Sequence, residues 1–249
     1  MLSLAMIISY PQIDSTNRVA KELAAEGKPS GTVVVAASQL AGRGQYGRSF
    51  NSPVGGLYFS LLLEPVIPIE KLPLITLATG LACRNVLHQS FNLQPLIKWP
   101  NDIYLGGKKT AGILCENISL PHSPSNMTQV IIGVGINVNN KKEDFAAEIQ
   151  PIITTLFEHL QVTVDLESLL TLLLQAITTN VTRLLDESQL LLEEWQQYDL
   201  LFNKPVVHAT EALTIHGFGK GISPQGLYVI QDEHGVELRV IGGQLRPQG

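Results

Sequence analysis

Apolar segments in this chain do not alternate regularly between strand and helix patterns, and their order limits the folds open to it. Short runs rich in β-branched and aliphatic residues predict strands at residues 31–38, 57–63, 96–99 and 129–139, with a hairpin through Gly106-Gly107. Helical spacing predicts helices at about 15–26, over 74–82, and twice between 166 and 198. The strands cluster around a few helices without repeated strand–helix–strand units. We therefore expect an α+β fold built on a mixed, largely antiparallel sheet.

The end of the chain has a different character. After Asn203-Lys204-Pro205, short strand patterns at 206–209, 226–230 and 236–241 are separated by glycines. A segment of about 48 residues buries little apolar surface by itself, so we expect a small β-barrel that docks on the preceding part. The sequence thus predicts two domains, residues 1–200 and residues 201–249.

The composition argues against several classes of function. A net charge of −5 disfavours binding to a nucleic-acid backbone, since that affinity comes from many lysine and arginine contacts. No apolar run approaches the roughly 18 residues that span a bilayer, and the first ten residues lack the charged start and cleavage site of a secretory signal. Cys83 and Cys115 are too few for a disulfide framework and have no metal-ligand spacing. We expect a cytoplasmic protein with reduced thiols that acts on neither DNA nor membranes.

Positive charge is nevertheless concentrated in one stretch, residues 31–115, where seven basic residues stand against three acidic ones. Four of the basic residues, Arg43, Arg48, Lys98 and Lys109, lie inside motifs rather than in ordinary surface positions. Local positive charge within an acidic protein indicates a small anionic ligand.

A glycine-rich loop, Gly42-Arg43-Gly44-Gln45-Tyr46-Gly47, fits the G-x-G-x-x-G pattern of dinucleotide-binding sites and follows a predicted strand. That fingerprint needs a helix starting in the loop, whereas here Asn51-Ser52-Pro53 and Gly55-Gly56 lead directly to a strand. The lysine followed by serine or threonine that a phosphate-binding P-loop requires is also missing. Glycines let a backbone approach a ligand closely, and Arg43 and Arg48 offer forked donors to a carboxylate or phosphate. An anion site is therefore favoured over a plain surface turn.

Three further motifs place polar residues or glycines at strand ends or within strands. Lys98-Trp99-Pro100-Asn101-Asp102 ends a strand with a cation, an aromatic plane and two polar groups, although a simple turn also accounts for the polar pair. Lys108-Lys109 begins a buried-looking strand, where a charge needs a partner nearby. Gly133 and Gly135 lie in the middle of a strand, where one reason to keep a glycine is close approach of a ligand.

Taken together, these residues resemble the biotin protein ligase family. The resemblance rests on five motifs in matching order and spacing: Asp14-Ser15-Thr16-Asn17, Gly42 to Arg48, Lys98 to Asp102, Lys109 to Leu114 and Gly133 to Asn137. It extends to the tail, where Asn203-Lys204-Pro205-Val206 and Gly242-Gly243 are similar to that family's C-terminal SH3-like domain. The Lys-Trp-Pro-Asn-Asp run is typical of the biotin branch rather than of the related lipoate ligases and octanoyl transferases.

The resemblance implies a class II synthetase-like catalytic domain and the activity of a biotin–[acetyl-CoA-carboxylase] ligase. In that reaction the biotin carboxylate attacks the α-phosphate of ATP to give biotinyl-5′-AMP and diphosphate, and a lysine of a biotin carboxyl carrier protein then takes the biotinyl group. Mg²⁺ is expected mainly on the ATP phosphates, so the resemblance implies no particular protein ligands for it.

The resemblance also assigns roles to residues of this chain. Its implied catalytic residues are Lys109, Arg43 and Arg48; Lys109 is preferred to Lys108 because it stands two residues before Ala111-Gly112. The implied biotin-binding residues are Ser15, Thr16, Gln39, Gly42, Arg43, Lys109, Gly133 and Gly135. The implied ATP-binding residues are Gly44, Gln45, Arg48, Lys98, Asn101, Asp102 and Asn137. For Ser15 the alternative is that it only caps the helix that follows it.

Departures from the family pattern leave some alternatives open. Gln45 stands where the family's loop commonly has another arginine, and Phe50 where it has a tryptophan, so formation of the adenylate is predicted more firmly than its retention. Regulatory members carry an N-terminal helix-turn-helix domain, but the Asp14 motif lies almost at the start of this chain, and we expect no such domain. Alternative functions are a lipoyl-type acyltransferase and a non-catalytic biotin sensor. The sequence leaves open whether the chain is a monomer or a homodimer.

Overall fold

Two sheets and five helices organise residues 6–118, 128–211 and 213–248, the part of the chain that the computed structural model describes. The strands of the larger sheet are β1 (Met6–Tyr10), β2 (Thr32–Ala36), β3 (Leu57–Leu63), β4 (Leu96–Lys98), β5 (Asp102–Leu105), β6 (Lys108–Ile118) and β7 (Gln129–Ile136). The helices are α1 (Thr16–Ala25), α2 (Leu74–Phe91), α3 (Leu156–Leu160), α4 (Leu166–Arg183) and α5 (Ser188–Gln196). The smaller sheet contains β8 (Pro205–Ala209), β9 (Thr214–Ile222), β10 (Tyr228–Gln231), β11 (Glu237–Val240) and β12 (Gln244–Pro247).

The pairing of the strands confirms the expected α+β class. The larger sheet has the order β1-β2-β3-β7-β6-β5-β4, and the smaller one has the order β11-β10-β9-β8-β12. β1 runs parallel to β2, whereas the remaining neighbours are antiparallel. The larger sheet is therefore mixed and largely antiparallel, and the C-terminal segment forms an antiparallel sheet of its own.

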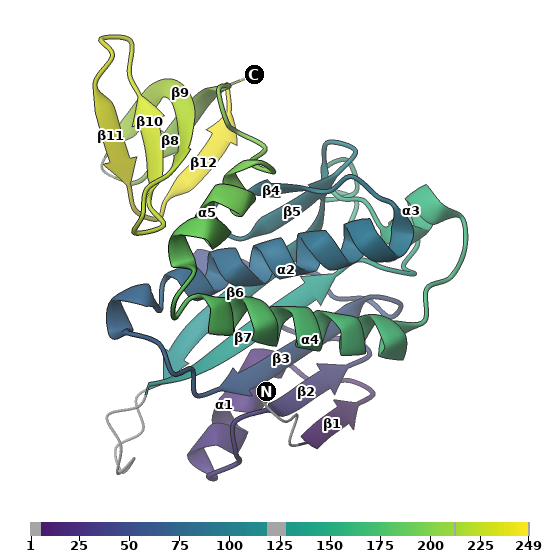
Figure 1. The fold of residues 1–249 in the computed structure, drawn as a ribbon. Coiled ribbons are helices and arrows are strands. Elements are labelled where there is room, and N and C mark those ends of the chain that lie inside the picture. The colour runs from purple at the N-terminus through teal and green to yellow at the C-terminus, as the bar shows by residue number, and fades with distance from the viewer. Residues whose placement is uncertain (1–5, 119–127, 212, 249) are drawn as a thin grey trace.

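One face of the larger sheet is covered by α2 and by α4, which lies beside α2 and also contacts β3 (Figure 1). Apolar side chains surround α2 almost completely, as is typical of a helix that is buried on all sides. The helix ends where Asn92 adopts the left-handed conformation, with φ of 52°. α4 begins at Asp165, whose carboxylate accepts a hydrogen bond from the Ser168 amide. Side chains of α2 and α4 and of the sheet form the main hydrophobic core on this side.

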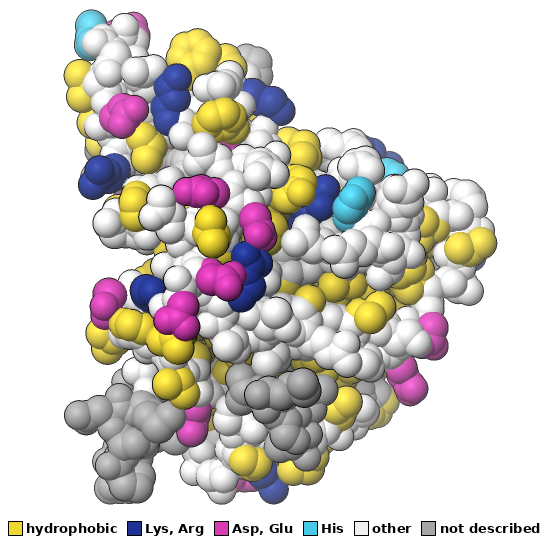
Figure 2. Space-filling model, in the orientation of Figure 1, with side chains coloured by type: hydrophobic (Ala, Val, Ile, Leu, Met, Phe, Trp, Pro, Cys, Tyr) yellow, Lys and Arg dark blue, Asp and Glu magenta, His cyan; other side chains and the backbone are white. Residues whose placement is uncertain are grey.

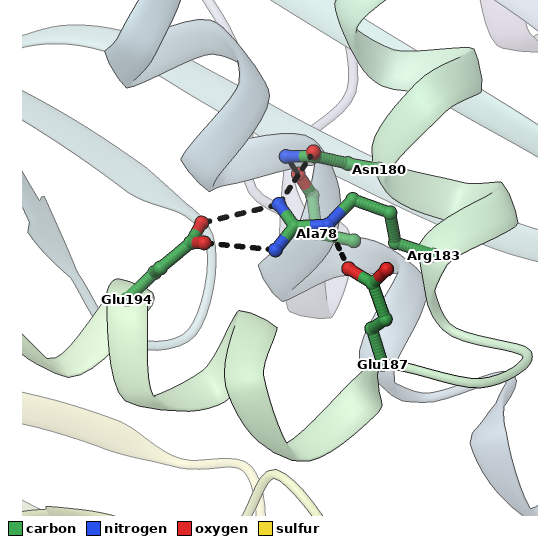
Figure 3. A network of polar contacts seen from close by, with 5 residues as sticks. All are labelled: Ala78, Asn180, Arg183, Glu187 and Glu194. Carbon is green, nitrogen blue, oxygen red and sulfur yellow. Dashed lines mark hydrogen bonds and ion pairs between the residues drawn. The ribbon is translucent and has the colours of Figure 1, made fainter.

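A polar network holds the helices of this layer together (Figure 3). The Arg183 guanidinium donates two hydrogen bonds to the Glu194 carboxylate and one to Glu187, which joins α4 to α5. Asn180, which lies one turn before Arg183, donates to the Ala78 carbonyl of α2. Acidic and basic side chains accordingly lie together over α5 in the space-filling view (Figure 2). The network fixes the position of α5 and thus of the chain that leaves it.

The opposite face of the sheet carries α1. Val19, Ala20 and Ala24 of this helix pack on β2, β3 and β7, while its other side faces water. The helix follows Ser15, whose backbone is extended, and ends before Gly27, which has φ of +81°. Because α1 covers only part of this face, Gly112, Gly133 and Gly135 of β6 and β7 are among the residues that line the cleft described below.

The smaller sheet forms a lobe beside α5 and the β4 edge of the larger sheet (Figure 1). The chain reaches it through Tyr198 to Leu201, which runs along β4: the Ile97 amide donates to the Tyr198 carbonyl, and the Leu200 amide donates to the Ile97 carbonyl. The expected boundary near residue 200 stays a prediction. In the described part of the chain, no helix has the length and apolarity needed to cross a membrane.

Most expected elements are present with ends that shift by a few residues, except that α2 continues nine residues beyond the predicted end at 82. The structure also contains four elements for which the sequence patterns gave no prediction: β1, β9, β12 and α3. β9 was missed because three glycines interrupt its apolar pattern. The hairpin through Gly106 and Gly107 is confirmed, with both glycines at positive φ. Cys83 and Cys115 are free thiols, as expected, and burial raises the pKa of each to about 12.

Candidate active site

A cleft opens where the free face of the larger sheet meets the glycine-rich loop and the smaller sheet. It brings together thirteen of the residues predicted from the sequence: Ser15, Thr16, Gln39, Arg43, Gly44, Gln45, Arg48, Lys98, Asn101, Asp102, Lys109, Gly133 and Gly135. Of the two adjacent lysines, Lys109 lines the cleft and Lys108 does not. Motifs that are far apart in the sequence therefore meet in one place.

Two predicted residues, Gly42 and Asn137, do not line this cleft. A side chain at Gly42 would place its Cβ 2.4 Å from the Phe50 carbonyl oxygen and 2.7 Å from Ser52 Oγ, so this glycine serves the close packing of its own loop. Asn137 is buried, and its side-chain amide donates to the Thr154 carbonyl. Its Oδ1 has no hydrogen-bond partner among the described residues. Binding roles for these two residues stay predictions.

The polar end of the cleft is arranged by a chain of hydrogen bonds that starts at α1. The Thr16 amide and hydroxyl both donate to Gln39 Oε1, at 2.8 and 3.2 Å, and Gln39 Nε2 donates to Ser52 Oγ at 2.8 Å. Ser60 Oγ lies 2.8 Å from Thr16 Oγ1 and 2.6 Å from Asn17 Oδ1, so its single hydrogen serves one of the two. These contacts hold Thr16 and Gln39 in fixed orientations at the cleft wall.

Ser15 and Asn17 differ in what they offer to a ligand. Both hydrogens of the Asn17 amide are used, by the Leu114 carbonyl at 3.2 Å and by Glu116 Oε2 at 2.7 Å. Asn17 therefore positions the start of α1 on the sheet. Ser15 stands at the cap position, but its side chain makes no capping hydrogen bond. The alternative that Ser15 serves only as a cap is thus not supported, and its hydroxyl is available to a ligand.

The strand glycines make room for side chains that come from other elements. A Cβ at Gly133 would lie 2.0 Å from Asn17 Oδ1, and one at Gly135 would lie 2.5 Å from the Phe50 ring. Gly112, which pairs with Gly135 across β6 and β7, faces the same ring at 3.0 Å. Phe50 therefore lies on a flat patch of backbone that only glycine can provide. Sequence reasoning noted the glycines but not these occupants.

The glycine-rich loop is a narrow hairpin with a single 3₁₀ turn at Gln45–Gly47 rather than the start of an α-helix. The Phe50 amide donates to the Gly42 carbonyl at 2.8 Å, and the Gly44 amide donates to the Arg48 carbonyl at 2.7 Å. Tyr46 at its tip has φ of 57° and lies against Gly242 of the smaller sheet, where a Cβ would be 2.4 Å from the Tyr46 hydroxyl. The rejection of a dinucleotide-binding turn is confirmed, and the loop bridges the two sheets.

The other end of the cleft is strongly cationic. Lys109 Nζ lies 2.6 Å from Asp102 Oδ1, and both side chains are mostly buried. Burial lowers the pKa of Lys98; Lys109, Arg48 and Arg246 lower it further, while Asp102 acts in the opposite direction. Among the described residues, five cations and a single carboxylate line the cleft. An arrangement with this excess of positive charge is suited to a ligand that carries several negative charges.

Arg246 is the functional candidate that sequence reasoning missed. It lies on β12 of the smaller sheet, at the end of the chain, and lines the cleft together with Gly243, Gln244 and Leu245. No local pattern marks it, because its meeting with Lys98 depends on how the two sheets dock. Trp99, Phe50 and Tyr46 also line the cleft. Trp99 was noticed only as part of its motif, and Phe50 only as a departure from the family.

The described residues provide no cluster of three or more His, Cys, Asp or Glu side chains that could hold a metal ion. Asp102, the acidic side chain that lines the cleft, is engaged with Lys109. Magnesium commonly binds through one or two carboxylates together with substrate phosphates. This donor set therefore fits a magnesium ion that is held mainly by a ligand's phosphates.

Comparisons with known proteins agree on one group of enzymes. Residues 9–137 match the model of the biotin/lipoate A/B protein ligase family. The bifunctional ligase/repressor BirA of Bacillus subtilis is 34% identical over 236 residues, which cover 93% of this chain and 71% of that protein. The biotin–[acetyl-CoA-carboxylase] ligase of Paracoccus denitrificans is 29% identical, with 90% and 94% covered. A structure of the Aquifex aeolicus biotin protein ligase with biotin and ATP superposes with a TM-score of 0.83 at 30% identity, covering 98% of this chain and all of that one.

Proposed function

The chain belongs to the biotin/lipoate A/B protein ligase family, and from this premise we propose that it activates biotin with ATP and transfers the biotinyl group to a lysine of a biotin carboxyl carrier protein. Because the family's name covers biotin and lipoate, the choice of biotin rests on the relatives and on the cleft. The observation that carries the proposal is the division of the cleft into a polar end at α1 and a cationic end at Lys98, Lys109 and Arg246. A neutral, hydrogen-bonding head group suits the first end, and a triphosphate suits the second.

In the first step, a biotin carboxylate oxygen forms a bond to the α-phosphorus of ATP, and diphosphate leaves with the electron pair of the broken phosphorus–oxygen bond. Two anions must approach each other, so the catalytic need is for fixed positive charge around the reacting phosphate. Lys109, at the cationic end of the cleft, is assigned to bridge the carboxylate and the α-phosphate. Arg48 and Lys98 are assigned to the remaining phosphate oxygens, together with Arg246.

The ion pair between Lys109 and Asp102 prepares this step. At 2.6 Å, the carboxylate holds the ammonium group in the cleft and keeps it from turning towards water. When substrates bind, Lys109 gains two further anionic partners, the biotin carboxylate and the phosphate. Asp102 therefore has a positioning role in this proposal.

The biotin ring is assigned to the end of the cleft next to α1. Ser15 offers a hydroxyl that makes no hydrogen bond to its helix, and Thr16 donates two hydrogen bonds that hold it to Gln39. A ureido group presents one acceptor and two donors, and fixed polar groups at a cleft wall give such a ligand its orientation. Arg43, on the loop that covers the cleft, is assigned to the carboxylate side of biotin.

In the second step, the acceptor lysine amine attacks the acyl carbon of the adenylate, AMP leaves, and the amine loses a proton to water. The adenylate must be kept from water until the acceptor arrives. The loop from Gly44 to Arg48 is assigned this covering role, with Tyr46 resting on Gly242 of the smaller sheet. Magnesium, bound mainly by the ATP phosphates, would neutralise part of the charge on the leaving diphosphate.

The proposal divides the work between the two parts of the chain. Residues 1–200 hold biotin, the reacting carboxylate and most of the nucleotide site. Residues 201–249 complete the nucleotide side through Arg246 and support the loop through Gly242.

Paired lysine variants test the chemistry. Lys109→Ala removes a fixed charge aimed at the reacting phosphate, and loss of such a group lowers turnover by roughly 10²- to 10³-fold. Lys108→Ala removes the neighbouring charge, which does not line the cleft, and we expect a change of less than about twofold, as for most surface substitutions. Release of diphosphate in the presence of biotin and ATP measures the first step for both variants. Near-native release by Lys109→Ala would show that the reacting phosphate is not held by this lysine.

A further inference from the structure

The end of β4 is joined directly to the smaller sheet by Trp99. The indole Nε1 of Trp99 donates to the Gly226 carbonyl at 3.0 Å, and the indole packs on the Tyr228 ring with the centroids 5.8 Å apart. Trp99 immediately follows Lys98 and also lines the cleft. Trp99, a residue of the cleft wall next to Lys98, therefore contacts the smaller sheet through both a hydrogen bond and its aromatic face.

The Tyr228 hydroxyl is hydrogen-bonded to a buried carboxylate, that of Asp199. The hydroxyl donates to Asp199 Oδ2 at 2.7 Å, and Asp199 Oδ1 accepts from the Leu201 amide at 2.9 Å. Tyr228 is fully buried, and Asp199 is 9% exposed. A buried, ionisable side chain is costly unless it is well bonded, so its presence at this contact indicates a geometric requirement.

The segment that carries Asp199 is itself bound to β4. Asp199 forms a parallel bridge with Ile97, the residue before Lys98. Contacts therefore run from Ile97 of β4 to Asp199, from Asp199 to Tyr228, and from Tyr228 to Trp99, which directly follows β4. We call this set the Asp199–Tyr228–Trp99 joint.

The space around the joint allows little adjustment. A Cβ at Gly219 would lie 2.6 Å from the Tyr228 hydroxyl, and one at Gly226 would lie 2.6 Å from Leu74 of α2. A Cβ does not approach other atoms this closely, so only glycine fits at either position. Glycine at these positions lets the smaller sheet pack closely on Leu74 of α2 and around the Tyr228 hydroxyl.

Seating of the smaller sheet determines where β12 places its side chains. Gly243, Gln244, Leu245 and Arg246 line the cleft, and Arg246 is close enough to Lys98 to affect its pKa. A small rotation of the sheet would move Arg246 relative to Lys98 and Lys109, since β12 lies at the edge of the sheet.

We propose that Asp199, Tyr228 and Trp99 are positioning residues for ATP binding: the joint fixes the smaller sheet so that Arg246 completes the cationic end of the cleft. This inference rests on the proposed function only in taking ATP as the ligand of that end. It assigns no contact with substrate to the joint itself, because the joint acts through Arg246.

A double-mutant cycle on Tyr228 and Arg246 tests this coupling. Arg246→Gln removes a charge-assisted contact, which corresponds to a rise of about 10- to 100-fold in the Kd for ATP. Tyr228→Phe keeps the ring on Trp99 and removes only the hydroxyl, and we expect a rise of about 3- to 10-fold. Because both act on the same contact, the double variant should bind ATP no more weakly than Arg246→Gln alone. The Kd for biotin, measured without ATP, should stay within about twofold in all three variants.

Tyr58→Phe is the matched control. It also loses a buried tyrosine hydroxyl, one that donates to the Pro53 carbonyl at 2.8 Å and accepts from the Asn140 amide at 3.4 Å, both of which lie outside the smaller sheet. It should lower the melting temperature comparably and leave the Kd for ATP unchanged. An unchanged Kd in Tyr228→Phe, or losses that add fully in the double variant, would overturn the proposal.

Calorimetric titration with ATP keeps this test separate from the test of the proposed function. If the native chain binds ATP but activates lipoate instead of biotin, the proposed substrate is wrong and the cycle still reports on the joint. If the native chain does not bind ATP, both proposals fail.

Discussion

Replacing Asp199 by asparagine should change how the stability of the protein depends on pH. Burial raises the pKa of Asp199 from 3.8 to about 6, against the opposing effects of the Leu201 amide, the Tyr228 hydroxyl and the charge of Lys204. The native protein therefore holds this proton more tightly than the unfolded chain does. Its stabilising contribution is complete below about pH 4 and is lost as the pH rises through about 6. Asparagine keeps the shape of the side chain and does not titrate.

The size of the effect follows from the shift in pKa. A shift of about two units corresponds to about 3 kcal/mol of unfolding free energy, of which about 2 kcal/mol falls between pH 4.5 and 7.5. At roughly 2 to 4 °C per kcal/mol for a protein of this size, the melting temperature of Asp199→Asn should gain about 4 to 8 °C on the native protein across that interval. Other groups titrate equally in both proteins, so the difference isolates Asp199.

Thermal unfolding at about six pH values, followed by tryptophan fluorescence, measures this difference. Trp99 contacts the smaller sheet and Trp195 lies in the main core, so the fluorescence reports on unfolding at both places. Asp186→Asn, which removes an exposed carboxylate after α4, controls for the loss of one negative charge. Melting curves of Asp199→Asn and the native protein that shift in parallel over the whole range would refute the assignment of a raised pKa to this carboxylate.

Two further predictions concern the cleft. Gln45→Arg restores the guanidinium that the family's loop commonly carries. It should slow the loss of adenylate by less than about tenfold, because Arg43 and Arg48 already serve the same loop. Labelling of a bystander protein measures the loss, and equal labelling by the native chain and the variant would show that position 45 does not govern retention. Gly133→Ala would place a Cβ 2.0 Å from Asn17 Oδ1, so it should destabilise the protein by about 1 to 3 kcal/mol and weaken biotin binding. A variant with the native melting temperature and the native Kd for biotin would show that the start of α1 can shift freely.

Local patterns in the sequence predicted those parts of the fold in which neighbouring residues decide the geometry. The apolar run of β3 and the hairpin at Gly106-Gly107 are examples, and the glycine-rich loop was correctly separated from a helix-forming turn. β9 was missed because its glycines are required by contacts with residues that are distant in the sequence. Gly217 and Gly219 allow close contact with the Gln231 and Leu201 carbonyl oxygens, each of which lies 2.3 Å from the point that a Cβ would occupy.

The same distinction holds for the cleft. Lys109 and Arg48 were found because each lies within a motif whose residues stay together in the fold. Arg246 was missed because its position depends on docking of the smaller sheet through Trp99 and Tyr228, which no local pattern encodes. Asn137 shows the opposite case: it belongs to a motif, yet its amide bonds to the Thr154 carbonyl outside the cleft.

Transfer of labelled biotin to a carrier domain tests the central claim most directly. The native chain is incubated with ATP, Mg²⁺, labelled biotin and a biotin carboxyl carrier domain, with parallel reactions that omit ATP or replace biotin by lipoate. We expect label on the carrier's acceptor lysine that depends on ATP, because the adenylate must form before the amine can attack. Absence of label with biotin, together with transfer of lipoate to its own carrier domain, would contradict it.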